Sequence, residues 1–210
     1  MVVSLVLLAN RAEAQVRPSD TLRLTVCLID DAGLTDEVVG KVQGRVDELF
    51  APSRIAIRWL RGGDPGRTVE ERWACEHPEV LQTVVIRWMK GGLVTSPNEL
   101  GEAFLDADGR GVIADLFLDK MERIKTAREV NFTVLLAHLT AHELGHLLLG
   151  GEPHSVSGLM EGKVNEEALR KMMQGNLGFS PAEQKRMRAR MKAAEVSATL
   201  ARHRPGQFGK

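Results

Sequence analysis

The stretch that decides the fold class is residues 131–160, which read NFTVLLAHLTAHELGHLLLGGEPHSVSGLM. Its first 19 residues contain no proline and place apolar side chains nearly all round a helical projection, so they predict a helix buried on most sides. His138, His142 and His146 recur every four residues and therefore lie on one stripe of that helix. Buried imidazoles need partners, and a shared metal ion would serve two or three of them.

Residues 142–146 read HELGH, which is the HExxH pattern. Because one helical turn separates His142 from His146, both rings can bind one Zn²⁺ at about 2.0–2.1 Å. Glu143 then points alongside the metal without binding it. We predict that Glu143 is the catalytic base, which takes a proton from a zinc-bound water as that water attacks a peptide carbonyl. His138 lies one turn earlier and is expected to be a core residue or a partner of a ligand.

The residues after the motif predict a third ligand. Gly150 and Gly151 end the helix and allow the chain to turn back, since glycine readily adopts the left-handed conformation. His154 follows eight residues after His146, where this reversal can bring it to the metal. Glu152, on the same turn, is a nearer carboxylate alternative, and zinc accepts either ligand type. We predict His142, His146 and His154 as the metal ligands.

The order of helix, HExxH, glycine turn, third histidine and Met160 resembles the metzincin clan of zinc peptidases. The sequence is particularly similar to a group of short bacterial predicted metzincin-like peptidases, which carry HExGHLLLG, then HS, then G-[IL]-M. The clan's general pattern is HExxHxxGxxH, whereas here Leu149 and Glu152 occupy the positions of that glycine and third histidine. The glycine is displaced by one residue, and His154 by two.

The metzincin resemblance implies a zincin-like α/β (α+β) fold, with a mixed twisted sheet, an active-site helix and a small helical C-terminal part. It implies one Zn²⁺ per chain, and a Met-turn in which Met160 forms a buried floor without binding the metal. A peptide substrate would extend along an edge strand containing Gly101 and Ala103. The chain has no tyrosine, so the zinc itself would carry most of the charge that develops on the substrate oxygen.

A different third ligand would place the protein in another class of zinc peptidase. Gluzincins take a glutamate from a later helix, and Asn165-Glu166-Glu167 resembles the opening of their NExxSD pattern. The residues that follow supply no Ser-Asp pair. We keep Glu166 as the alternative to His154.

The rest of the chain predicts a scaffold in which strands and helices alternate. Residues 22–29 and 84–89 are apolar and β-branched, residues 55–59 alternate, and Thr35 caps a helical pattern that runs to Phe50. Residues 103–105 and 112–118 flank a turn and predict a hairpin. Residues 62–82 are expected to be a long connection. A β-α-β start of this kind implies a mixed sheet with a helix on one face.

Composition restricts the partners and the compartment. Of 210 residues, 43% are hydrophobic and 27% are charged, which indicates a globular protein, and 28 basic residues balance 28 acidic ones. No global charge therefore attracts nucleic acid, and residues 180–210, with eight basic and two acidic residues, are interpreted as a solvated helix face and tail. The apolar runs are too short for a stable membrane anchor.

The predicted boundaries are a truncated signal peptide over residues 1–14, one catalytic domain over 15–200 and a loose tail over 201–210. The signal peptide rests on an apolar run followed by Ala12-Glu13-Ala14. It predicts a secreted or periplasmic protein, or a cytoplasmic one if the run is not a signal. Cys27 and Cys75 could form a disulfide in an exported protein, although the apolar strand around Cys27 favours a buried thiol.

The predicted function is a zinc-dependent endopeptidase, a hydrolase of peptide bonds in peptide or protein substrates. The rival from another class is a secreted, non-catalytic binding module that retains a structural zinc. Glu143 distinguishes them, because a structural zinc site needs no carboxylate there and usually closes with four protein ligands.

Overall fold

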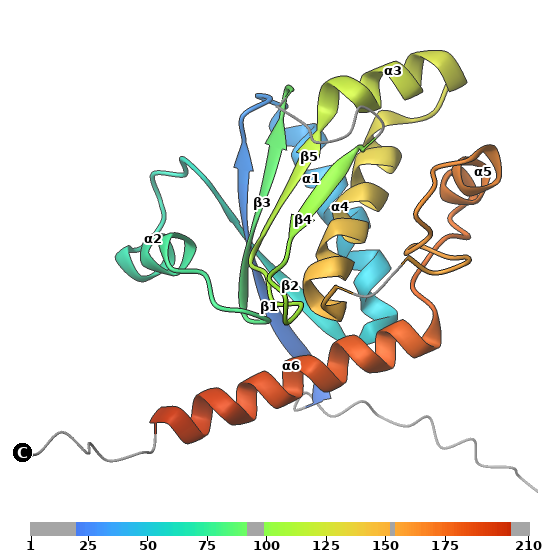
Figure 1. Cartoon of the computed structure of the whole chain (residues 1–210). Coiled ribbons are helices and arrows are strands. Elements are labelled where there is room, and N and C mark those ends of the chain that lie inside the picture. The colour runs from blue at the N-terminus through green and yellow to red at the C-terminus, as the bar shows by residue number, and fades with distance from the viewer. Residues whose placement is uncertain (1–19, 92–98, 152–153, 203–210) are drawn as a thin grey trace, which may run out of the picture.

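The computed structural model describes residues 20–91, 99–151 and 154–202 (Figure 1). The predicted signal segment, Glu152 and residues 203–210 lie outside these ranges. The elements are β1 (Leu22–Asp30), α1 (Asp36–Phe50), η2 (Ala51–Ser53), β2 (Ile55–Arg61), α2 (Val69–Glu76), β3 (Thr83–Met89), β4 (Gly101–Phe104), β5 (Ile113–Phe117), α3 (Leu118–Arg128), α4 (Phe132–Leu149), α5 (Glu166–Gln174) and α6 (Pro181–Arg202).

The five strands form one mixed sheet in the order β2-β1-β3-β5-β4. Three pairs of neighbouring strands are parallel, namely β2–β1, β1–β3 and β3–β5. The fourth pair, β5–β4, is antiparallel, with Gly101 opposite Leu116. The β-α-β start and the hairpin are therefore confirmed, and β4 is an edge strand of this sheet. The predicted mixed α/β fold class is thus confirmed.

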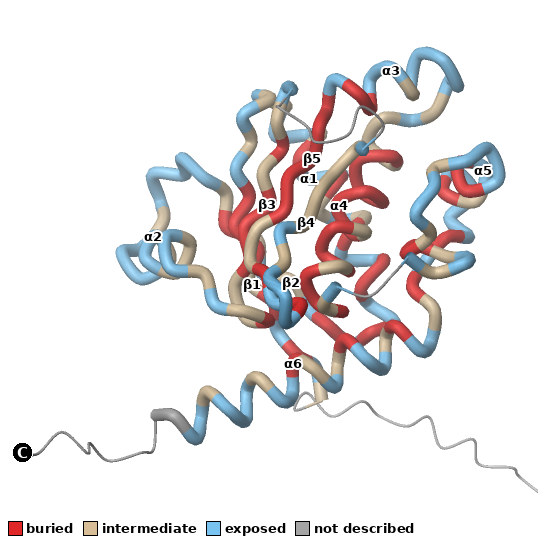
Figure 2. The backbone as a smooth tube through the Cα atoms, in the orientation of Figure 1, coloured by how far each residue is buried: buried red, intermediate tan, exposed pale blue. Residues whose placement is uncertain are grey.

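Helices α1 and α4 pack against each other and against one face of the sheet, which places the main core between sheet and helices (Figures 1 and 2). Along β1, Leu24, Val26 and Leu28 face this core and are fully buried. Cys27 points to the opposite face, where it joins a small cluster with Leu60 and Val85. This alternation follows from the period of two in a strand.

The face opposite α4 carries α2, which was not expected from the sequence. α2 lies inside the predicted connection of residues 62–82, and Thr68 and Glu71 form a capping box at its start. No residue of α2 is buried, so its sequence lacks the apolar stripe that reveals most surface helices. A disulfide joins Cys27 to Cys75 at the end of α2, with 5.7 Å between the Cα atoms. The interpretation of Cys27 as a free buried thiol was wrong.

Three further helices, α3, α5 and α6, lie beside α4. α3 follows β5 directly, and α5 begins after Asn165, whose side chain accepts a hydrogen bond from the Ala168 amide. α6 begins after Ser180 and continues to Arg202, two residues into the segment expected to be a tail. Met187 and Met191 of α6 are buried against the core, as the spacing of its apolar residues predicts.

Candidate metal centre

Helix α4 is a rigid platform for the histidines. Asn131 caps it by accepting a hydrogen bond from the Val134 amide, and Thr140 accepts one from the Trp88 indole at 3.2 Å. The helix is long and apolar enough to cross a membrane, but 13 of its 18 residues are buried inside the fold. It is therefore the core helix of this domain. It ends at Gly150, whose φ of 78° is the left-handed conformation predicted for this turn.

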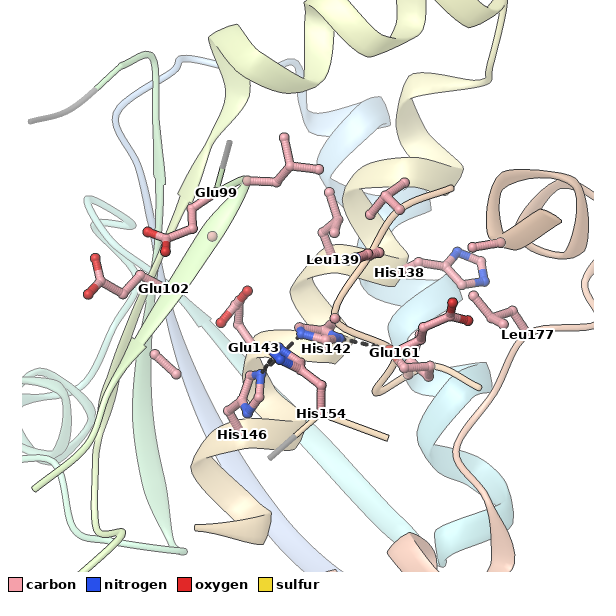
Figure 3. Close-up of a pocket in the computed structure, with 18 of the residues that line it drawn as sticks. Glu99, Glu102, His138, Leu139, His142, Glu143, His146, His154, Glu161 and Leu177 are labelled. Atoms are coloured by element: carbon pink, nitrogen blue, oxygen red, sulfur yellow. Dashed lines mark hydrogen bonds between the residues drawn. The ribbon is translucent and has the colours of Figure 1, made fainter. Parts of the chain in front are cut away.

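The structure brings His142, His146 and His154 together at one point (Figure 3). The Nε2 atom of His146 lies 3.0 Å from Nε2 of His142 and 3.2 Å from Nε2 of His154. Ligand atoms held tetrahedrally at 2.0–2.1 Å from one zinc ion lie about 3.3 Å apart, so the distances from His146 to the other two rings are close to those of a zinc site. Although the glycine and His154 are displaced relative to the metzincin pattern, the turn still brings His154 to the rings of His142 and His146.

The protonation of His142 and His146 also suits a metal. Nδ1 of His142 lies 2.7 Å from the Leu159 carbonyl oxygen, which can only accept, so Nδ1 carries the proton and Nε2 presents its lone pair. Burial lowers the pKa of His142, and burial together with the neighbouring rings lowers the pKa of His146 to about 3. Both rings are neutral at pH 7, as metal ligands must be.

The loop that carries His154 is fastened to α6. The Ser155 hydroxyl donates to one carboxylate oxygen of Glu183, and the other oxygen accepts from the Ser180 amide. The Ser155 amide donates to the Met160 carbonyl at 2.9 Å. The ring of His154 lies so close to the backbone at position 162 that a Cβ atom on Gly162 would lie 2.6 Å from it.

Met160 is buried next to α4, where a Cβ atom on Gly145 would lie 2.5 Å from its sulfur. The side chain therefore packs against the helix between the two ligands of the HExxH motif. The role of Met160 as a Met-turn stays a prediction.

Glu143 extends from α4 toward β4, beside the three rings (Figure 3). Its side chain is buried, with 4% of the residue exposed. Burial, followed by the negative charges of Glu102 and Glu99, raises the pKa of Glu143 to about 8. At this pKa the carboxyl group is mostly protonated at pH 7, and the positive charge of a metal ion at the three rings would favour the carboxylate form that a general base requires.

The other candidate residues do not reach the cluster. His138 is 1% exposed in the core, with Nδ1 2.8 Å from the Val134 carbonyl oxygen. Glu166 lies in the first turn of α5 and pairs with Arg128. Glu152 lies outside the described residues. Glu166, the gluzincin alternative, is thus absent from the cluster, and Asn165, which begins the resembling sequence, is the cap of α5.

The cluster opens into a cleft of about 660 Å³ between β4 and the segment after Met160. Gly101 and Ala103 line it from β4, as predicted, and Glu99 and Glu102 lie on the same side. Its apolar lining includes Leu139, Ile124, Val164, Ala168, Met172 and Leu177. Of these, Ile124 lies in α3, and Ala168 and Met172 lie in α5, two helices that the sequence pattern did not reveal.

The fold and the histidine cluster define a zincin-like domain with a candidate three-histidine metal site. No protein-family model matches the chain, and no curated protein matches it significantly in sequence. Its fold is similar to the crystal structure of archaemetzincin from Methanopyrus kandleri, with a TM-score of 0.52 and 14% identity over 84% of this chain and 99% of that one. Metalloproteinase-II from Bacteroides fragilis gives a TM-score of 0.48 and 17% identity over 83% of this chain and 55% of that one.

Proposed function

We propose that the protein is a zinc-dependent endopeptidase of the metzincin type. The observation that carries this proposal is the convergence of three imidazole nitrogens beside a buried glutamate, at the mouth of a cleft bordered by an edge strand. His142, His146 and His154 would hold one zinc ion. The similarity of the fold to that of archaemetzincin is consistent with this class.

The chain's own residues supply the remaining functions. When bound, zinc supplies a Lewis acid that polarises the peptide carbonyl and acidifies a water molecule. Glu143 accepts the proton of the attacking water and returns it to the leaving amine; a metal cation held by the three rings would lower its pKa and favour the carboxylate needed for the first transfer. The substrate backbone extends along β4, whose outer edge offers hydrogen-bonding groups to an added strand. His142 and His146 are partly buried and His154 is exposed, so a substrate can reach the cluster from the cleft.

The alternative is a non-catalytic module with a structural zinc. Structural zinc sites usually have four protein ligands, whereas the described residues bring together three. A buried carboxyl group costs free energy unless it has a function or a partner, and Glu143 is placed beside the open side of the cluster. Both observations favour the enzyme.

The test is a peptide-library digest with the zinc-loaded protein, with and without a chelator. Glu143→Gln is the critical variant, because the amide has the same shape but is a far weaker base. We expect this variant to retain about one zinc per chain and to lose at least about 10²-fold in turnover. Cleavage that survives in Glu143→Gln, or the loss of zinc from it, would contradict the assigned role.

We also propose that the protein is exported. The Cys27–Cys75 disulfide supports this proposal, because disulfides persist in oxidising compartments and are rare in the cytosol. Titration of free thiols in protein recovered from the extracellular or periplasmic fraction of the native cells should find none. Recovery in the cytosol with two free thiols would contradict export.

A further inference from the structure

Gly101 lies directly against Glu143. A Cβ atom at position 101 would lie 2.6 Å from Oε1 of Glu143 and 2.9 Å from both Cδ and Cγ. Real Cβ atoms essentially never approach heavy atoms so closely. Three atoms of the Glu143 side chain therefore occupy the space that any side chain at position 101 would need.

The backbone of Gly101 does not explain why this residue is glycine. Its φ is not among the positive values that favour glycine, and it pairs regularly with Leu116 of β5. Glycine weakens a strand and has no side chain to pack, so a glycine inside a strand often marks a close approach by another group. Here the approaching group is the carboxylate of Glu143. Ala103, two residues later on the same side of β4, carries a methyl group and lines the same cleft.

We infer that Gly101 is a positioning residue for the proposed peptidase: its missing side chain forms the seat that holds the Glu143 carboxylate between β4 and the histidine cluster. This inference rests on the proposed function. It adds that Gly101 fixes the position of the proposed base, Glu143. Gly101 touches neither metal nor substrate through a side chain and acts only through Glu143.

The size of the effect follows from the distances. An ordinary van der Waals contact needs about 3.4 Å or more. A methyl group at position 101 therefore displaces Oε1 by roughly 0.8 Å, and a misplacement of about 1 Å can cost about 10² in rate. The three nearest contacts of this methyl group are all with Glu143. Gly101→Ala should thus reduce kcat by 10- to 100-fold, with KM and zinc content little changed.

The experiment is a double-mutant cycle of Gly101→Ala and Glu143→Ala, with Gly40→Ala in α1 as the matched control. A Cβ atom at Gly40 meets nothing within 4 Å, so the same chemical change there has room. Each protein is tested for zinc content, thermal unfolding with and without zinc, and kcat and KM where it cleaves peptide. We expect Gly101→Ala to lower Tm when Glu143 is present, and not when Glu143→Ala has removed the three contacting atoms.

An equal fall in Tm in both backgrounds would overturn the inference, because the methyl group would then collide with something other than Glu143. Retention of full kcat by Gly101→Ala, or a fall in kcat accompanied by loss of zinc, would also overturn it. If the native chain cleaves no peptide, the proposed function fails, and the Tm comparison still decides whether Gly101 seats Glu143.

Discussion

The disulfide between Cys27 and Cys75 leads to a quantitative prediction of stability. The bond closes a loop across 48 positions of sequence. Loop-closure entropy for this length gives about 4 kcal/mol of stabilisation of the folded state at 25 °C. Cys75→Ser is the preferred perturbation, because it breaks the bond at its more exposed end and leaves the buried Cys27 side chain in place. We expect the free energy of unfolding to fall by up to this amount.

Urea unfolding followed by far-UV circular dichroism measures this change. For an m value of about 2–3 kcal/mol/M, a loss of 4 kcal/mol lowers the midpoint by about 1.3–2 M. A reducing agent should lower the midpoint of the native protein similarly and leave that of Cys75→Ser unchanged. Because the bond lies on the face of the sheet opposite α4, folded Cys75→Ser should keep its zinc affinity. A midpoint equal to that of the oxidised native protein would refute the reasoning.

Three further predictions concern the ligands, the core histidine and the helix cap. His154→Ala should weaken zinc binding by more than 100-fold, measured by chelator competition, while Glu166→Ala leaves it unchanged. Loss of zinc from Glu166→Ala but not from His154→Ala would restore the gluzincin alternative. Burial lowers the pKa of His138, so the stability that its neutral ring contributes is present above pH about 6.5 and is lost as pH falls below it. His138→Asn, which keeps a donor for the Val134 carbonyl, should therefore show a flatter fall in urea midpoint from pH 7 to 5; equal slopes would contradict this. Asn131→Ala should lower the free energy of unfolding by about 1 kcal/mol through loss of the cap on α4, and an unchanged urea midpoint would count against that cap.

The sequence predicted those helices and strands in which apolar residues recur with the period of the element. Residues 131–149 were expected to be a helix, and α4 spans Phe132–Leu149. The strands at 22–29 and 84–89 and the hairpin before α3 were predicted for the same reason, because apolar or β-branched runs between turn residues have few alternatives. The two histidines of the HExxH motif follow from helical spacing alone, since one turn brings them together.

The parts that could not be predicted depend on contacts between distant segments. His154 was expected at the cluster from the glycine turn, but the contacts that hold its loop, from Ser155 to Glu183 and to Met160, are not visible as a local pattern. The short helix α2 carries only a local signal, its capping box. The pairing of Cys27 with Cys75 required knowing that α2 returns to the back of the sheet.

The hydrogen bond from Ser155 to Glu183 has a consequence for the time course of biosynthesis. The loop bearing His154 is fastened by a residue that the ribosome adds 28 positions later. A nascent chain can therefore present all three histidines before it can hold the third in place. Because domains generally fold as units, we expect the three rings to reach their final positions only after the beginning of α6 has been synthesised and docked.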